Sequence, residues 1–324
     1  MHSIRDLQER VAASFATEKF LFEPAALYEP IVYALSQGGK RIRPLLVMMS
    51  TDLFGGSVEE AVKPSIGVEI FHNFTLLHDD IMDNAPMRRG QPSVYRKWNS
   101  NVAILSGDTM FVMAYDYICQ VRKEILPQTI ALFNDTARKV CEGQQYDMDF
   151  ETQKDVTIAD YLHMIRLKTA VLLACSVKLG AILSGAGEED TRTIYAFGDH
   201  LGMAFQLQDD YLDMYGDFTK FGKEIGGDIV TNKKTFLYLK AYETARGDDL
   251  IRLTSYFRDP ELDPAVKIEK IREIYTALGI DKMTLSLIES YLSKALSCLD
   301  EVRTDEHRKA GLRELALEML NREA

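Results

Sequence analysis

Several features that would mark a secreted, membrane or nucleic-acid-binding protein are scarce or missing in this 324-residue chain. Only four cysteines occur, and no two of them have the CxxC spacing of a metal or redox motif. They are Cys119, Cys141, Cys175 and Cys298. The first three lie in apolar periodic segments, so we expect reduced core residues of a cytoplasmic protein.

Long apolar runs and an excess of positive charge are also missing. No stretch approaches the roughly 18 uncharged apolar residues of a membrane span. The opening sequence MHSIRDLQERVAASF is charged where a signal peptide needs an apolar run. The formal charge of -11 argues against a nucleic acid as partner. We therefore expect a cytoplasmic protein without a membrane span.

Signals for β-strands, linkers and repeats are weak throughout. Alternating β-branched runs bounded by hairpin turns are absent, whereas helical periodicity dominates from end to end. Ser57-x-x-Glu60 and Thr157-x-x-Asp160 indicate capping boxes that open two of the helices. Other helices are expected near residues 99–121, 127–147, 192–215, 234–246, 265–278, 282–300 and 305–322. The sequence therefore predicts one all-α domain spanning residues 1–324.

Two Asp-Asp-x-x-Asp triplets are the most informative motifs present. The first consists of Asp79, Asp80 and Asp83, and the second consists of Asp209, Asp210 and Asp213. Residues four apart share a helix face, so the outer aspartates of each triplet should lie side by side. Both helices are expected to end just past the triplet, at Asn84-Ala85-Pro86 and at Gly216, where the helix dipole disfavours negative charge. These crowded carboxylates favour a cation site, and hard oxygen ligands suit Mg²⁺ shared with substrate phosphates.

Three basic clusters accompany the triplets. The first is the motif GGKRIRP at 38–44, a glycine turn before an apolar helix, in which Lys40 and Arg43 are expected to point the same way. The second is Arg88-Arg89-Gly90. The third begins with Lys168-Thr169 in an apolar helix, where a buried lysine needs a partner. It continues with Lys223, Lys233 and Lys234.

Each motif alone has a simpler explanation as a solvated helix end or a turn. Two like triplets, each followed by basic residues, instead favour a site where Mg²⁺ and a diphosphate complete the charge balance. A P-loop is excluded because Gly222-Lys223 is followed by Glu224. A di-iron site is disfavoured because Glu69-x-x-His72 has no second Glu-x-x-His pair.

Seven motifs follow one another between about Gly38 and Thr235: GGKRIRP, HNFTLLHDDIMDNAPMRRG, GDTMF, EGQQYD, RLKTA, FQLQDDYLD and GKEIGGDIVTNKKT. In this order they resemble the all-trans isoprenyl diphosphate synthases, which make farnesyl and geranylgeranyl diphosphate. The resemblance implies an all-α bundle of long helices around a deep central cavity, usually a homodimer. It also implies that an allylic diphosphate ionises, that isopentenyl diphosphate attacks the cation, and that a proton is then lost.

The resemblance also gives the motif residues expected roles. Three Mg²⁺, for which Mn²⁺ is a potential replacement, would be bound by Asp79, Asp83 and Asp209, with Asp213 in the same metal-binding set and Asp80 and Asp210 in support. The allylic diphosphate would contact Arg88, Lys168, Lys223 and Lys233, with Lys233 preferred over Lys234. The isopentenyl diphosphate site would comprise Lys40, Arg43, His72 and Arg89. The reacting carbons would lie beneath Thr169 and Gln206, with Gln144 and Asp147 in support.

Product length is expected to depend on the helix that carries the first triplet, where this family has its cavity floor. Phe74 precedes Asp79 by about 7.5 Å along the helix axis, and Phe71 precedes it by about 12 Å. A bulky Phe74 should stop elongation early. Thr75 stands where the eukaryotic farnesyl type has a second aromatic residue, and the first triplet lacks the insertion of the bacterial farnesyl type. We expect a C15–C20 product, leaning to C20.

Two alternatives stay open at this point. A class I terpene cyclase shares the first triplet, but it normally carries an Asn/Ser/Glu metal motif in place of the second and lacks the isopentenyl diphosphate residues. A catalytically silent regulatory subunit of a heteromeric synthase usually loses one triplet, whereas both are present here. Head-to-head condensation is disfavoured by the same isopentenyl diphosphate residues.

Overall fold

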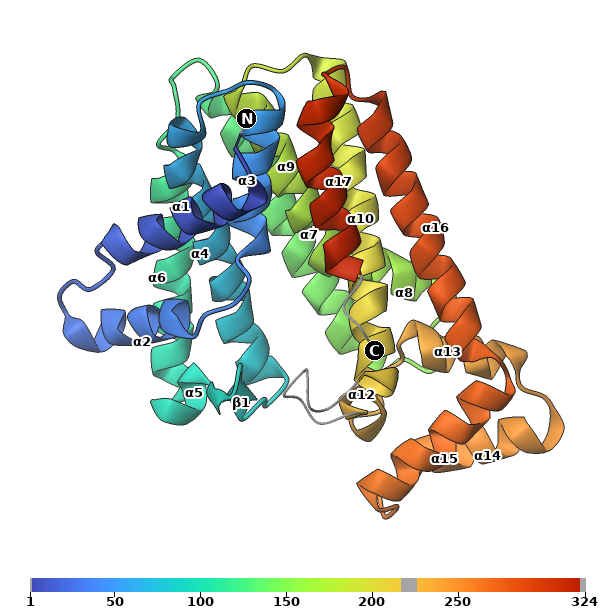
Figure 1. Cartoon of the computed structure of the whole chain (residues 1–324). Coiled ribbons are helices and arrows are strands. Elements are labelled where there is room, and N and C mark those ends of the chain that lie inside the picture. Colours follow the sequence, from blue (N-terminus) through green and yellow to red (C-terminus); the bar gives the residue numbers. More distant parts are fainter. Residues whose placement is uncertain (1, 217–225, 321–324) are drawn as a thin grey trace. The chain divides into compact units, whose positions relative to one another are not determined.

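The computed structural model describes residues 2–216 and 226–320, and Lys223 of the predicted site therefore lies outside the described residues. Helices account for nearly all regular structure in these ranges, which confirms the all-α prediction (Figure 1). The sheet found there is a hairpin of β1 (Met87–Arg88) and β2 (Gln91–Pro92), which the sequence did not predict.

The chain divides into two compact units. Unit 1 comprises Met1–Asn134, Cys175–Ile194 and Arg303–Leu312, and unit 2 comprises Asp135–Ala174, Tyr195–Val302 and Arg313–Ala324. Helices that contribute residues to both units are α7 (Leu126–Thr152), α9 (Val171–Leu183), α10 (Glu188–Tyr215) and α17 (Glu306–Leu320). The single domain with a central cavity stays a prediction.

Unit 1 is built around the long helix that carries the first triplet. Its complete helices are α1 (Ile4–Thr17), α2 (Ala25–Ser36), α3 (Ile42–Leu53), α4 (Val58–Met82), α5 (Val94–Lys97) and α6 (Ser100–Ile118). α4 packs against α3 and α6, α1 packs against α3, and α2 packs against α6 (Figure 1). Leu46, Ile66 and Phe71 are fully buried in this layer. Each such side chain contributes about 1.5–3 kcal/mol on burial, so packing fixes α4 in place.

Two helices of unit 1 begin at residues whose side chains cap them, and the predicted capping box of α4 forms in one direction only. Ser57 caps α4 by accepting a hydrogen bond from the Glu60 N–H at 3.4 Å, while the Glu60 carboxylate lies 3.5 Å from the Arg122 guanidinium. Asn99 caps α6 by accepting from the Val102 N–H at 2.9 Å. Both bonds satisfy N–H groups that a helix cannot pair internally.

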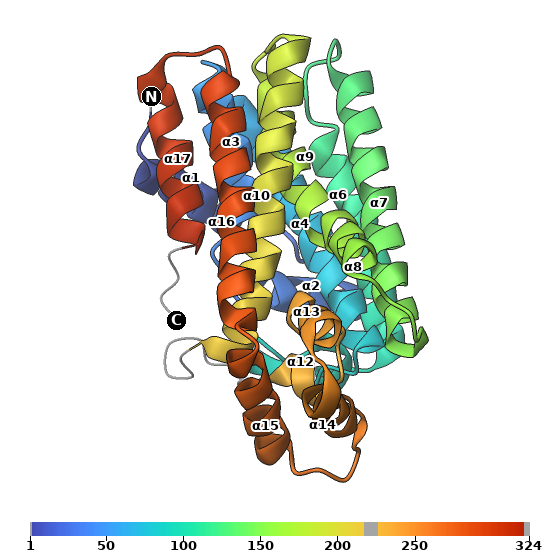
Figure 2. The same cartoon turned by 90° about the vertical axis from the view of Figure 1, so that its right-hand side faces the viewer.

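Unit 2 contains the second triplet and most of the C-terminal helices (Figure 2). Its complete elements are α8 (Ile158–Ile165), the π-helical turn η1 (Arg166–Ala170), α12 (Gly227–Val230), α13 (Phe236–Thr244), α14 (Gly247–Arg258), α15 (Pro264–Ala277) and α16 (Ile280–Glu301). α15 packs against α12, α14 and α16. The stacked rings of Tyr238 and Phe257, 3.7 Å between centroids, lie in a core with the fully buried Tyr275. Helix α14 was not predicted, because its Gly-Asp-Asp start resembles a loop.

Thr157 and Asp160 form the predicted capping box at the start of α8, with hydrogen bonds of 3.1 and 3.0 Å in the two directions. The helix expected to follow is not uniform. Its middle turn is η1, in which the chain takes the wider π-helical path before α9 resumes.

The four cysteines are free thiols, as predicted, but they differ in exposure. Cys175 is buried, Cys119 and Cys298 are half-buried, and Cys141 is exposed. The prediction of a core position is wrong for Cys141, because Val140 rather than Cys141 occupies the inward face of α7.

Within the described residues, none of the helices combines the length and the apolar character that crossing a membrane would require.

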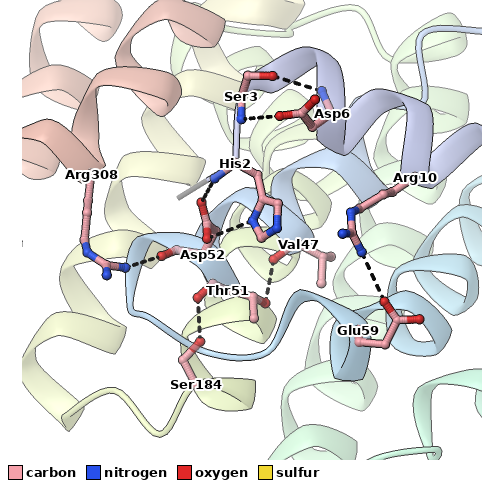
Figure 3. A network of polar contacts seen from close by, with 10 residues as sticks. All are labelled: His2, Ser3, Asp6, Arg10, Val47, Thr51, Asp52, Glu59, Ser184 and Arg308. Carbon is pink, nitrogen blue, oxygen red and sulfur yellow. Dashed lines mark hydrogen bonds and ion pairs between the residues drawn. The ribbon is translucent and has the colours of Figure 1, made fainter.

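The N-terminal segment of unit 1 is fastened to the end of α3 (Figure 3). The His2 backbone N–H donates to one carboxylate oxygen of Asp52 at 2.8 Å, and the His2 ring Nδ1 lies 3.2 Å from the other. Arg308 donates to the Asp52 carbonyl at 2.8 Å, and Ser184 donates to the Thr51 carbonyl at 3.0 Å. Asp52 is therefore a largely buried junction of segments that are distant in sequence.

Replacing Asp52 by Ala should lower the free energy of unfolding by about 1–3 kcal/mol, because the donors on His2 lose their acceptor in a largely buried position. Denaturant unfolding monitored by circular dichroism measures the change. The matched control is Glu9→Ala, which removes only an exposed ion pair with Arg5 and should leave stability nearly unchanged. Equal effects of the two substitutions would contradict the junction role of Asp52.

Candidate active site

The first triplet lies in the last turn of α4 and at its C-cap. The Ala85 N–H donates to the Asp80 carbonyl at 2.9 Å and the Asn84 N–H donates to the Ile81 carbonyl at 3.3 Å, which is the Schellman pattern. Asn84 adopts the left-handed conformation that this pattern needs, with φ of 51°. The helix therefore stops at the predicted break, with Asp83 as its C-cap.

The middle aspartate of the first triplet is buried and paired. Asp80 is 3% exposed, and Arg88 donates to its Oδ1 from Nε at 2.9 Å and from Nη2 at 2.6 Å. Burial raises the pKa of Asp80, and the neighbouring Arg88 acts in the opposite direction. Asp79 is half-buried and Asp83 is exposed. The structure thus pairs Arg88, which is predicted to contact the allylic diphosphate, with the middle aspartate of the triplet.

The β1–β2 hairpin places its two arginines against different partners, Arg88 against Asp80 and Arg89 against the Gly38 turn. Its turn is Arg89-Gly90, with φ of 51° and 75°, as a two-residue type I′ turn requires. A left-handed arginine is unfavourable, so the position must be stabilised from outside. The Arg89 guanidinium donates to the Gly38 carbonyl. A Cβ on Gly39 would lie 2.8 Å from the Arg89 Cζ, so the glycine turn is shaped to admit this side chain.

The predicted GGKRIRP cluster is not arranged as the helical spacing assumed. Helix α3 begins at Ile42, so Lys40 precedes the helix and is exposed, whereas Arg43 lies in its first turn. The intervening Arg41 is the N-cap, in the left-handed region at φ of 45°. Its guanidinium carbon lies 3.7 Å from the centre of the Phe15 ring, and Nη2 donates to the Leu35 carbonyl at 3.0 Å.

A buried carboxylate balances these arginines, a role that the sequence did not predict for it. Glu69 on α4 is 3% exposed and accepts from the Asn73 amide at 3.3 Å through Oε1. Its Oε2 has no hydrogen-bond partner among the described residues. Burial raises the pKa of Glu69, while the positive charges of Arg43, Arg41 and Arg89 oppose the rise. The four charged groups therefore form one electrostatic cluster beside His72.

His72 is placed in the same positive environment. Burial lowers the pKa of His72 well below its usual value, and Arg43, Arg89 and Arg88 lower it further. A neutral imidazole is expected near neutral pH, so His72 can both donate and accept hydrogen bonds. Of the residues predicted to bind isopentenyl diphosphate, Arg43, His72 and Arg89 are thus brought together, with Lys40 on the preceding turn.

The second triplet, in unit 2, repeats the arrangement of the first. Its middle aspartate, Asp210, is buried, and Tyr161 donates its hydroxyl to Oδ2. Gln206 donates its amide to Oδ1 at 3.0 Å and accepts from the Thr169 hydroxyl at 2.8 Å. Burial raises the pKa of Asp210, and the Asp228 carboxylate raises it further. Tyr161 was missed because only tertiary structure brings α8 to α10.

Lys168 has the partner that its apolar surroundings predicted. Its Nζ lies 2.6 Å from Oδ2 of Asp147 on α7. Lys168 and Thr169 both belong to η1, and π-helical turns occur often at functional sites. Gly143 of α7 allows the close approach, because a Cβ there would lie 2.7 Å from the carbonyl carbon of Leu167.

The segment beyond the second triplet folds back onto Asp213. The Asp228 N–H donates to Asp213 Oδ2 at 3.0 Å, which places the start of α12 against this carboxylate. Lys234 donates to the carbonyls of Phe150 and Glu151 in the last turn of α7.

A family model described as Polyprenyl synthetase matches residues 24–276. The chain belongs to this family. It is 35% identical over 302 residues to the geranylgeranyl diphosphate synthase of Methanosarcina mazei, covering 93% of this chain and 91% of the relative. It is 34% identical over 284 residues to the geranylfarnesyl diphosphate synthase of Natronomonas pharaonis, covering 82% and 83%. A crystal structure of a geranylgeranyl pyrophosphate synthase matches with a TM-score of 0.96 at 43% identity, covering 100% of both chains.

The recognition made from the motifs is therefore confirmed: the protein is an isoprenyl diphosphate synthase, a short-chain trans-prenyltransferase. Isopentenyl diphosphate and an allylic diphosphate are the substrates that this activity implies. Neither the cyclase nor the regulatory-subunit alternative finds support in the comparisons.

Prenyl diphosphate synthases generally use a divalent metal. The side chains of both triplets fit a hard cation, because all of them are carboxylates. The middle carboxylate of each triplet already accepts a hydrogen bond from a protein donor, so the first and last aspartates are the candidate metal ligands. Among the described residues, no group of three or more His, Cys, Asp or Glu side chains is arranged to hold a metal by itself.

Replacing Gly143 by Ala in this synthase should lower the free energy of unfolding by about 1–3 kcal/mol, because the new methyl group overlaps the backbone of η1. Prenyl transfer should fall as well, since α7 and η1 carry Asp147 and Lys168, and the family resemblance assigns Lys168 a role at the allylic diphosphate. Denaturant unfolding and a steady-state assay measure the two effects. Gly187→Ala is the control, because nothing lies within 4 Å of the added Cβ. A Gly143→Ala protein as stable and active as this control would contradict the proposed fit.

Proposed function

We propose that this synthase condenses isopentenyl diphosphate with an allylic diphosphate to give geranylgeranyl diphosphate, using three Mg²⁺ bound by the outer aspartates of both triplets. The observation that carries the proposal is the repeated arrangement of the triplets. In each, the middle aspartate is buried and bonded to protein donors, Asp80 to Arg88 and Asp210 to Tyr161 and Gln206. The first and last aspartates are more exposed. The two helix ends therefore share a buried, bonded middle aspartate flanked by more exposed carboxylates.

The basic residues fall into two groups, one for each diphosphate substrate. Mg²⁺, when bound, would neutralise the leaving diphosphate as the allylic C–O bond breaks. We assign Arg88, Lys168, Lys233 and, outside the described residues, Lys223 to the allylic diphosphate. Lys40, Arg43, His72 and Arg89 are assigned to isopentenyl diphosphate. Glu69 holds the arginines of the second group together by opposing their mutual repulsion.

The hydrogen-bonded chain of Thr169, Gln206 and Asp210 supports a role beside the reacting carbons. Since the Gln206 amide N–H₂ donates to Asp210, its carbonyl oxygen is oriented towards Thr169. These fixed dipoles can stabilise positive charge without being alkylated, because neither group is a strong nucleophile. The π electrons of isopentenyl diphosphate then form the new C–C bond, and the proton lost in elimination goes to the released diphosphate.

The proposal is tested by incubating the protein with isopentenyl diphosphate, Mg²⁺ and each of dimethylallyl, geranyl and farnesyl diphosphate. Products are dephosphorylated and sized by chromatography. We expect a C20 alcohol from each primer and no product when a chelator removes the metal. A cyclised hydrocarbon from an allylic substrate alone would indicate a cyclase, and no turnover with any primer would indicate a partner-dependent subunit.

An aromatic cluster on α4 and α6 supports a short product. The ring centroid of Phe74 lies 5.6 Å from that of Phe71 and 5.2 Å from that of Phe111. The His78 ring lies 4.8 Å away on the side of the triplet. Phe74 is therefore held in place by neighbours, as a cavity floor needs to be. Relatives named for C20 and C25 products agree with a floor deeper than that of a farnesyl synthase.

Replacing Phe74 by Ala should lengthen the product beyond C20, because removing the ring opens space above Phe71. Chromatography of the dephosphorylated products measures chain length directly. Phe22→Ala, which truncates an exposed aromatic residue, is the control and should leave the product unchanged. An unaltered product from Phe74→Ala would remove Phe74 as the floor.

We also propose a homodimer. Leu105 and Val112 on α6 are 58% and 61% exposed and lie seven residues apart, on one face of the helix, with Ile104 beside them. Burial of these three side chains in a subunit contact would remove them from water. Light scattering of the purified protein tests the proposal, and the 36.7 kDa mass of a monomer would overturn it.

A further inference from the structure

The segment from Gly226 to Lys234 follows the second triplet and carries Lys233, which the proposed function places at the allylic diphosphate. It is anchored to the triplet at its start. The Gly226 N–H donates to the Asp213 carbonyl at 2.6 Å, and the Asp228 N–H donates to the Asp213 carboxylate at 3.0 Å. The position of Lys233 therefore depends on how the other end of the segment is held.

That other end is a Schellman turn whose key residue is not glycine. The Lys233 N–H donates to the Asp228 carbonyl at 2.8 Å, and the Asn232 N–H donates to the Ile229 carbonyl at 3.2 Å. Asn232 has φ of 59°, in the left-handed region. Asparagine tolerates this region better than most residues, but at a cost that glycine does not have. The left-handed conformation of Asn232 sets the direction in which the chain enters Lys233, and a contact from outside the turn would stabilise it.

Helix α15 supplies this contact. Lys267 donates from Nζ to the Asn232 side-chain oxygen at 2.6 Å. The lysine is 5% exposed, and its ammonium lies 5.7 Å from the centre of the Phe257 ring on α14. Ile268, the next residue, fills the space beside Gly226, where a Cβ would lie 2.6 Å from it. Two adjacent residues of α15 thus touch both ends of the segment.

Because Lys267 is buried, its hydrogen bond to Asn232 is more than an incidental surface contact. A buried ammonium needs an acceptor, because its lost hydration is otherwise uncompensated. Burial lowers the pKa of Lys267, while Asp259 acts in the opposite direction. The bond to Asn232 is therefore worth more than an exposed lysine contact would be.

We propose that Lys267 is a positioning residue for the allylic diphosphate site: through Asn232 it fixes the turn that presents Lys233, which makes α14 and α15 a support of that site. The inference rests on the proposed role of Lys233. It predicts that losing the Lys267 ammonium impairs the allylic diphosphate and spares isopentenyl diphosphate, since the residues assigned to the latter belong to unit 1.

The test compares Lys267→Met, which keeps the apolar stem, with Lys270→Met, an exposed lysine of the same helix that pairs with Glu273. We expect the KM for the allylic diphosphate to rise about tenfold in Lys267→Met alone, from the loss of one charge-assisted hydrogen bond. The KM for isopentenyl diphosphate should stay unchanged. Adding Asn232→Gly to Lys267→Met should restore most of the loss, because glycine adopts the left-handed conformation without support.

A parallel Lys233→Met variant distinguishes a failure of the proposed role of Lys233 from a failure of the inference about Lys267. If it leaves the KM for the allylic diphosphate unchanged, the role of Lys233 is wrong and the inference is overturned with it. If it raises this KM while Lys267→Met does not, only the inference is overturned. Equal losses for both substrates, or no rescue by glycine, would show a general structural role instead. Should Lys267→Met fail to fold, the exposed Asn232→Ala tests the same contact and should give the same selective rise.

Discussion

Negative charge gathered at the carboxyl end of a helix is the constraint on which the functional part of this synthase depends. The helix dipole, burial and the neighbouring carboxylates all disfavour the ionised form of an aspartate at this position. The protein tolerates it by giving the middle aspartate of each triplet strong donors. Arg88 is brought to Asp80 by a hairpin, and Tyr161 is brought to Asp210 by packing of α8. In the proposed function, a cation and a diphosphate at the outer aspartates complete the charge balance.

The parts of this design that are local in sequence could be predicted. Ser57 and Thr157 cap helices where their spacing indicates, and α4 ends at the predicted break. The ordered motifs also identified the family, because many short patterns in a fixed order rarely coincide by chance. That Lys168 needs a partner could also be predicted, since a lysine in an apolar helix cannot stay unpaired, but the identity of that partner, Asp147, comes from the structure.

The parts that depend on contacts between distant segments could not be predicted. Glu69 looked like half of a metal motif, and only the packing of α4 near α3 and the hairpin reveals it as a balancing charge. The hairpin itself escaped notice because its strands are two residues long and lack β-branched side chains. Lys40 was assumed to share a helix face with Arg43, but the left-handed Arg41 starts the helix only at Ile42. Lys267 carries no motif, and its relation to Asn232 is purely tertiary.

The π-helical turn η1 has a consequence for how this part of the enzyme can change. Such a turn holds one residue more than an α-helical turn, so deleting one residue from it would restore an ordinary helix. The helices before and after the turn would keep nearly the same phase, because the wider turn absorbs its additional residue, but the residues of the turn itself would be redistributed around the helix axis. Lys168 or Thr169 would then leave its present partner, Asp147 or Gln206. The length of this segment therefore matters for these two contacts, and we expect insertions or deletions to be tolerated in the surface loops before they are tolerated here.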